Sequence, residues 1–174
     1  HGQLPIIWDK AVDSSVFDAG GNKWIDLTSG IFVANVGHSN PRISEALKTA
    51  LERPLISCYN YLSDSRIDYL NTLLQFAGGV FDKGYLVSAG TEATECVFKL
   101  AKMYGKASGK KRQVVVCFSG NWHGRTLGAQ LMADNCDQRS WLDFEYSEVV
   151  HIDFPYPWLF DDASEIPVFL EMQL

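Results

Sequence analysis

The chain has 174 residues, of which 47% are hydrophobic and 21% are charged, with a formal net charge of −6 at pH 7. This length and composition favour one soluble globular domain with a real core. Basic residues are neither in excess nor grouped, so nucleic acid is not expected as a partner. No run approaches the ~18 apolar residues of a membrane helix. The four cysteines lack metal-binding spacing, so we predict no metal site and a reducing compartment, the cytoplasm or the mitochondrial matrix.

A hairpin and a helix are the first predicted elements. Ser15–Asp18 and Lys23–Leu27 alternate in polarity, and the turn-forming residues Ala19–Asn22 join them. Asn40 followed by Pro41 predicts a helix start, with Asn as the cap and Pro at the first helical position. Apolar residues then recur at helical spacing up to Pro54, which predicts an apolar stripe formed by Ile43, Ala46, Leu47, Ala50 and Leu51.

A second helix is predicted from about Asp64 to Phe76, ending at Gly78-Gly79. Its expected buried residues are Ile67, Leu70, Leu73 and Leu74. A short apolar run, Gly84–Val87, predicts a strand that turns through Ser88–Glu95 into a third helix. The first N–H groups of a helix have no partner within it, so this turn is a candidate phosphate site. The alternative is a tight turn that contains glycine for steric reasons only.

A second strand, Val114–Phe118, is a continuous apolar run, as expected for a parallel strand buried on both faces. Strand, helix and strand predict one right-handed βαβ unit, which places both following loops at the carboxyl edge of the sheet. The second loop, Ser119–Thr126, contains Trp122 and His123. One loop offers backbone N–H groups to an anion, and the other offers an indole face to a flat ring. A phosphorylated aromatic cofactor would suit both.

The chain resembles the class III, pyridoxal-phosphate-dependent aminotransferases. The resemblance covers about residues 16–133 well, and five blocks occur in the family's order. These blocks are Gly21–Gly30, Asn35–Pro41, Ser88–Glu95, Gly120–Thr126 and, more faintly, Val168–Gln173, where Met replaces the Pro of the family's Glu-Pro strand.

The resemblance implies an α/β fold of the type I pyridoxal-phosphate enzymes, with a mainly parallel sheet, helices on both faces and part of a small amino-terminal domain. Residues 1–58 would belong to the small domain and residues 59–174 to the amino-terminal part of the large, cofactor-binding domain. Such chains are more than twice as long, so this one is expected to be incomplete. The lysine that forms the Schiff base is expected beyond Leu174, and no catalytic residue is assigned within the chain.

The resemblance also assigns cofactor-binding residues. Those matching Gly90 and Thr91 bind the phosphate of pyridoxal 5'-phosphate, the residue matching Trp122 stacks on the pyridine ring, and the one matching His123 lies beside it. For Trp122 the alternative is a core indole. Two carboxylates in the first turn of the helix, at Glu92 and Glu95, would repel a phosphate, so they are required to point away.

Substrate residues are implied as well. Ile31 and Phe32 match a stretch that borders the substrate pocket and often reaches the partner subunit. Glu171 matches a residue on the substrate side, at the end of a strand. His38 is predicted to be structural, Asp26 a surface residue, and Arg125 part of an exposed or structural salt bridge.

The implied activity is amino transfer between an amine or ω-amino acid and an oxo acid, in a homodimer. Ornithine, acetylornithine, 4-aminobutyrate and diaminobutyrate enzymes share these blocks, so the substrate stays open. A decarboxylating, dialkylglycine-type enzyme is one alternative. Others are a catalytically incomplete piece with a binding or structural role, and a nucleotide-binding module. The absence of G-x-G-x-x-G and of G-x-x-x-x-G-K-[ST] counts against the last.

Overall fold

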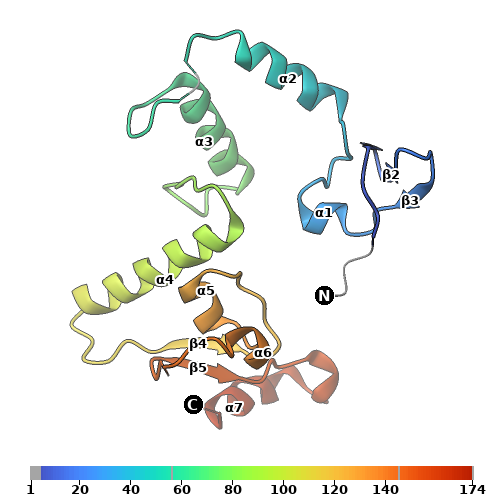
Figure 1. Ribbon diagram of the computed structural model, residues 1–174. Coiled ribbons are helices and arrows are strands. Elements are labelled where there is room, and N and C mark those ends of the chain that lie inside the picture. Colours follow the sequence, from blue (N-terminus) through green and yellow to red (C-terminus); the bar gives the residue numbers. More distant parts are fainter. Residues whose placement is uncertain (1–4, 56, 145, 174) are drawn as a thin grey trace. The chain divides into compact units, whose positions relative to one another are not determined.

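The computed structural model describes residues 5–55, 57–144 and 146–173. The chain divides into two compact units, His1–Phe76 and Ala77–Leu174, which run from blue to green and from green to red in Figure 1. Helix residues 64–76 belong to the first of these units. None of the described helices is long and apolar enough to cross a membrane.

The first unit begins with a three-stranded antiparallel sheet in the order β1-β2-β3, formed by β1 (Lys10–Val12), β2 (Ser15–Phe17) and β3 (Lys23–Ile25). The predicted hairpin is confirmed, with Val16 opposite Trp24, whereas β1 was not predicted. The turn is closed by Asp18, whose carboxylate accepts hydrogen bonds from the backbone N and the Nδ2 of Asn22, both at 2.9 Å.

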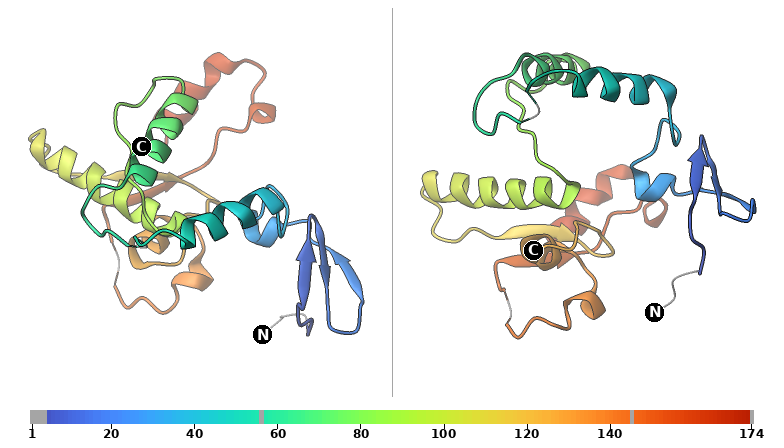
Figure 2. Two further views of the ribbon diagram at one scale, coloured as in Figure 1. Left: turned by 90° about the horizontal axis from the view of Figure 1, so that it is seen from above. Right: turned by 45° about the horizontal axis from the view of Figure 1, so that its top comes forward.

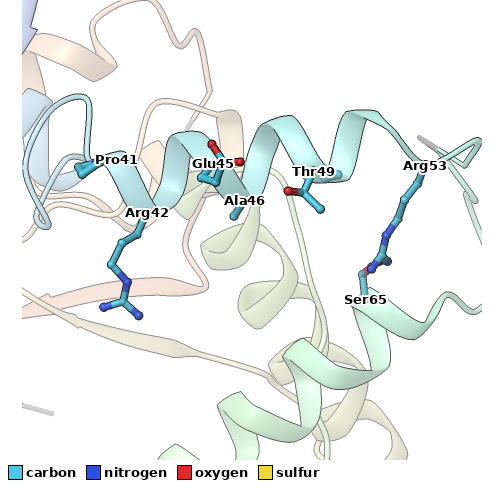
Figure 3. A pocket seen from close by; sticks show the side chains of 8 residues that line it. Pro41, Arg42, Glu45, Ala46, Thr49, Arg53 and Ser65 are labelled. Carbon is cyan, nitrogen blue, oxygen red and sulfur yellow. Dashed lines mark hydrogen bonds between the residues drawn. The ribbon is translucent and has the colours of Figure 1, made fainter.

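A short turn with positive φ angles, α1 (Ser29–Phe32), follows in this unit, and then the helices α2 (Pro41–Leu51) and α3 (Asp64–Phe76). The predicted cap is confirmed, since Asn40 Oδ1 accepts from Arg42 N at 3.0 Å. At the other end of α2, Arg53 reaches Ser65 of α3 across a hollow, with Nη1 donating to Oγ at 3.0 Å (Figure 3).

The second unit contains α4 (Gly90–Ala107), β4 (Val115–Phe118), α5 (Leu127–Met132), α6 (Cys136–Arg139), β5 (Val149–Ile152) and α7 (Ile166–Glu171), with short 3-10 turns at Pro157–Leu159 and Ala163–Glu165. β4 and β5 are parallel, with Val115 opposite Val149. Figures 1 and 2 show α4 on one side of this pair. Buried side chains of β4, β5 and α5 make its core, among them Cys117, Ile152, Ala129 and Met132.

Two predicted strands were wrong. Gly84–Val87 forms no strand, because a strand needs a neighbour to receive its backbone hydrogen bonds and none of the described residues pairs with it. The parallel unit that does form is β4–α5–β5, and β5 was not predicted. Val168–Glu171 lies in helix α7, not in a strand. Pro167 occupies its first turn, and the preceding Asp162 and Glu165 form a capping box that starts the helical path.

The predicted burial of the α3 stripe was also wrong, since Ile67 and Leu73 are exposed and Leu70 and Leu74 are only half-buried. Within the described part of the chain, α2, α3 and α4 contain no buried residue. Leu47 of α2 is 60% exposed and Val97 of α4 is 64% exposed. The periodicity correctly gave helices, but the described elements do not cover their apolar faces.

Candidate functional site

The start of α4 has free hydrogen-bond donors. Ala89, the residue before the helix, is extended and has no side-chain acceptor, so it cannot cap the first turn. No described side chain accepts from the N–H groups of Gly90 and Thr91. An ideal Cβ built on Gly90 meets no atom within 4 Å, so a ligand has room to approach the backbone there.

The loop after β4 meets this turn directly. Thr91 Oγ1 and Thr126 Oγ1 are 2.8 Å apart, and Thr126 N donates to Thr91 Oγ1 at 3.4 Å. Gly124 has φ +131°, and a Cβ there would lie 2.2 Å from Thr91 Oγ1. The two segments singled out in the sequence, about thirty-five residues apart, therefore lie side by side as expected.

The two carboxylates of the first turns both bind backbone N–H groups. Glu92 Oε2 accepts from Ser88 N at 2.8 Å. Glu95 Oε1 accepts from Gly128 N at 2.7 Å and from Ala129 N at 3.1 Å, and so caps α5. The sequence required both carboxylates to point away from a bound phosphate; Glu92 is exposed and Glu95 is half-buried against α5, and neither bonds the N–H groups of Gly90 and Thr91. A Cβ at Gly128 would lie 2.3 Å from Glu95 Oε2, so the glycine itself was the signal of this close contact.

The aromatic loop presents its indole outward. Trp122 is 57% exposed, so it is not a core residue, and the guanidinium carbon of Arg125 lies 5.6 Å from its ring centroid. Arg125 thus makes a cation–π contact in place of the predicted salt bridge. Burial, and secondarily the charge of His151, lowers the pKa of His123 from its ordinary value, which favours a neutral imidazole at pH 7.

Asn121 fixes this loop, and the sequence analysis missed it. Its Nδ2 donates to Met132 O at 3.0 Å, and its Oδ1 accepts from Asp134 N at 3.2 Å. Asp134 returns the contact, because its Oδ2 accepts from Gly120 N at 3.0 Å. Asn side chains commonly form hydrogen bonds with nearby backbone groups, so the presence of Asn121 in this loop was the sequence signal for its role.

The predicted substrate residues lie in different settings. Ile31 and Phe32 belong to the first unit and are 76% and 82% exposed. Glu171 is the exposed last residue of α7, so its expected place at a sheet edge was wrong. Asp26 is not a surface residue as predicted, because its side chain is only 6% exposed and binds His38 Nε2 at 2.8 Å. The structural role predicted for His38 agrees with this contact.

The sequence profile of the aminotransferase class-III family matches residues 1–165. The chain belongs to this family. Class-III relatives of known name include the mitochondrial acetylornithine aminotransferase of Candida glabrata, which is 35% identical over 69% of this chain and 30% of its own. The acetylornithine aminotransferase of Methanopyrus kandleri is also 35% identical, over 74% of this chain and 32% of its own. The chain thus spans about a third of these relatives' length.

Solved aminotransferase structures share the fold. The ornithine aminotransferase from Toxoplasma gondii ME49 superposes on 87% of this chain with a TM-score of 0.80 at 22% identity, over 36% of its own length. A Bacillus anthracis aminotransferase covers the whole chain with a TM-score of 0.79 at 21% identity, over 42% of its own length. The predicted family and the predicted type I α/β fold are confirmed.

Pyridoxal 5'-phosphate is the cofactor of this family, and the residues present fit its chemistry. A phosphate needs hydrogen-bond donors, and the start of α4 provides N–H groups that no described side chain caps, together with the Thr91 hydroxyl, which also contacts Thr126. A flat ring needs an accessible π-face, and the exposed indole of Trp122 offers one. The hydrogen bonds between Thr91 and Thr126 keep the two parts of the site together.

Proposed function

We propose that this chain forms part of an enzyme that transfers an amino group between an amine or ω-amino acid and an oxo acid, with pyridoxal phosphate as cofactor. The observation that carries the proposal is the contact between Thr91 at the uncapped start of α4 and Thr126 in the loop of Trp122 and His123. Phosphate donors and an aromatic face thereby lie within one unit.

The start of α4 would hold the phosphate. The N–H groups of Gly90 and Thr91 and the Thr91 hydroxyl would donate to its oxygens, and the helix dipole would add roughly 0.3–1 kcal/mol. Glu92 stays beside this turn, but its carboxylate is already bonded to Ser88 N. The phosphate would act as a fixed anchor while the rest of the cofactor reacts.

Trp122 and His123 would orient the ring. The cofactor, when bound, supplies an electron sink, and the protein supplies its orientation and surroundings. Trp122 would stack on the ring and hold it flat, with Arg125 packed on the indole. His123, neutral at pH 7 because burial lowers its pKa, can donate one hydrogen bond and accept another beside the ring.

The substrate would be an amino acid with an amino group at its far end. Supporting this are the names of the relatives, which are acetylornithine aminotransferases, and of a structural neighbour, an ornithine aminotransferase. Ile31 and Phe32 would border its carbon chain. Glu171 remains a proposed substrate residue on the resemblance alone. A homodimer and a location in the cytoplasm or the mitochondrial matrix are proposed on the same ground.

The purified enzyme that contains this chain, incubated with pyridoxal phosphate and N-acetylornithine or ornithine, tests the activity directly. Production of glutamate from 2-oxoglutarate supports transamination. Release of CO2 from a dialkylglycine would favour the decarboxylating alternative. Cofactor binding without either product would favour a binding or structural role.

A further inference from the structure

The backbone of the loop that contains Trp122 has little hydrogen bonding of its own. Among the described residues, no backbone–backbone hydrogen bond involves residues 120–125. Gly120 and Gly124, on either side of the indole, have φ angles of +73° and +131°, where glycine is free and other residues are strained. Backbone bonding alone therefore does not fix the direction of the indole, and side chains have to supply the support.

Asn121, the residue directly before Trp122, supplies it. Its Nδ2 donates to Phe118 O at the end of β4, and to Met132 O at the end of α5 at 3.0 Å. Its Oδ1 accepts from Asp134 N at 3.2 Å. One amide thus uses both of its donor hydrogens and its acceptor to tie the loop to a strand and to a helix.

The groups that Asn121 binds are themselves held in place. Met132 is only 5% exposed, and its carbonyl oxygen lies 2.9 Å from Nε2 of His151 in β5. Because a carbonyl oxygen only accepts, the imidazole donates a second hydrogen bond to it. Asp134 also binds the loop, since its Oδ2 accepts from Gly120 N at 3.0 Å. The residue before the indole is thereby fixed to the core of the second unit.

We propose that Asn121 and Asp134 are positioning residues, which hold the indole of Trp122 where it binds the ring of the cofactor. The indole is 57% exposed, and its contact with the Arg125 guanidinium lies within the same loop, so that contact cannot anchor the loop to the rest of the unit. The inference rests on the proposed function, because it assigns Trp122 to the ring. Neither Asn121 nor Asp134 is expected to touch the cofactor, and the phosphate is held separately at the start of α4.

The test is a double-mutant cycle in the enzyme that contains this chain, with the affinities for pyridoxal phosphate and for pyridoxal as readouts. Asn121→Ala should weaken both affinities by the same factor, about three- to tenfold, as the loss of one or two neutral hydrogen bonds implies. In the Trp122→Ala background the same substitution should have no further effect, because Asn121 acts through the indole. No loss in Asn121→Ala, or a loss that is equally large without the indole, would overturn the proposal.

Asn135→Ala is the matched control. Asn135 is also half-buried, and its Oδ1 accepts from Gln138 N at 3.0 Å at the start of α6, so the substitution removes a comparable bond away from the loop. It should leave both affinities unchanged. Asp134→Ala should weaken both, whereas Asp134→Asn, which keeps an oxygen for Gly120 N, should restore most of the loss. Equal losses in Asn135→Ala and Asn121→Ala would show a general loss of stability and contradict positioning.

The NMR signal of the Trp122 Nε1–H group separates this inference from the proposed function. In the enzyme without cofactor, Asn121→Ala should shift this signal and lower its heteronuclear NOE, and Asn135→Ala should do neither. If Trp122→Ala leaves the affinity for pyridoxal unchanged, the stacking role in the proposed function fails, but a changed signal in Asn121→Ala would still establish that Asn121 positions the indole. An unchanged signal would end the positioning role even in an enzyme that transfers amino groups.

Discussion

Replacing Glu95 with Ala should loosen the loop of Trp122 and His123 from α4. The carboxylate accepts from Gly128 N and Ala129 N, so the substitution leaves the first turn of α5 without its cap. Loss of a helix cap costs about 0.5–2 kcal/mol, and the charge at the dipole adds roughly 0.3–1 kcal/mol. Because Glu95 is only half-buried, we expect a total of about 1–2 kcal/mol.

Urea unfolding followed by far-ultraviolet circular dichroism measures this change. Lys99→Ala is the matched control, since Lys99 is an exposed residue of the same helix. Glu95→Gln should fall between the two, because the amide oxygen still accepts one hydrogen bond but has no charge. If Glu95→Ala and Lys99→Ala unfold at the same urea concentration, the cap contributes nothing and the reasoning fails.

Three further outcomes are expected. Gly124→Ala should weaken cofactor binding more than tenfold, because its Cβ would clash with Thr91 and its φ of +131° suits glycine; equilibrium dialysis measures this. The bond to His38 lowers the pKa of Asp26 to about 2, so its contribution to stability is present above pH 3.8 and is lost as the pH falls toward 2; acid unfolding should start at higher pH in Asp26→Asn than in Asp9→Asn. By NMR, His123 should titrate below its ordinary pKa, and His151→Gln should raise that pKa; no change would exclude a charge effect.

Local signals in the sequence predicted most of the first unit. Asn40 before Pro41 fixed the start of α2, since the cap is a bond between neighbouring residues. Helix α3 ends before Gly78 and Gly79, which have φ of +71° and +76°. These features depend on a few adjacent residues, so no knowledge of distant contacts was needed.

Features that depend on distant partners were not predictable in the same way. Gly84–Val87 has the composition of a strand, but pairing depends on another segment and composition does not supply it. The site shows the same limit. The sequence placed Thr91 and the loop of Trp122 at one edge, but it gave neither the bond to Thr126 nor the cap formed by Glu95.

The faint match of Val168–Gln173 to the family's Glu-Pro strand gave a wrong prediction for Glu171, which was expected at the end of a strand. The capping box at Asp162 and Glu165 and the position of Pro167 were visible in the sequence and indicate a helix. Similarly, Asp26 looked like a surface acid because its main partner, His38, lies twelve residues away.

The most direct test of the central claim is the affinity of the protein for pyridoxal phosphate and for pyridoxal, in the wild type, Thr91→Val and Thr126→Val. Both variants lose the bond between the two hydroxyls, but only Thr91→Val removes the proposed phosphate ligand. The account predicts that Thr91→Val weakens pyridoxal phosphate binding about tenfold or more, that Thr126→Val changes it by less than about threefold, and that pyridoxal binding responds to neither. Equal losses in the two variants, or equal affinity of the wild type for pyridoxal phosphate and pyridoxal, would contradict a phosphate site at the start of α4.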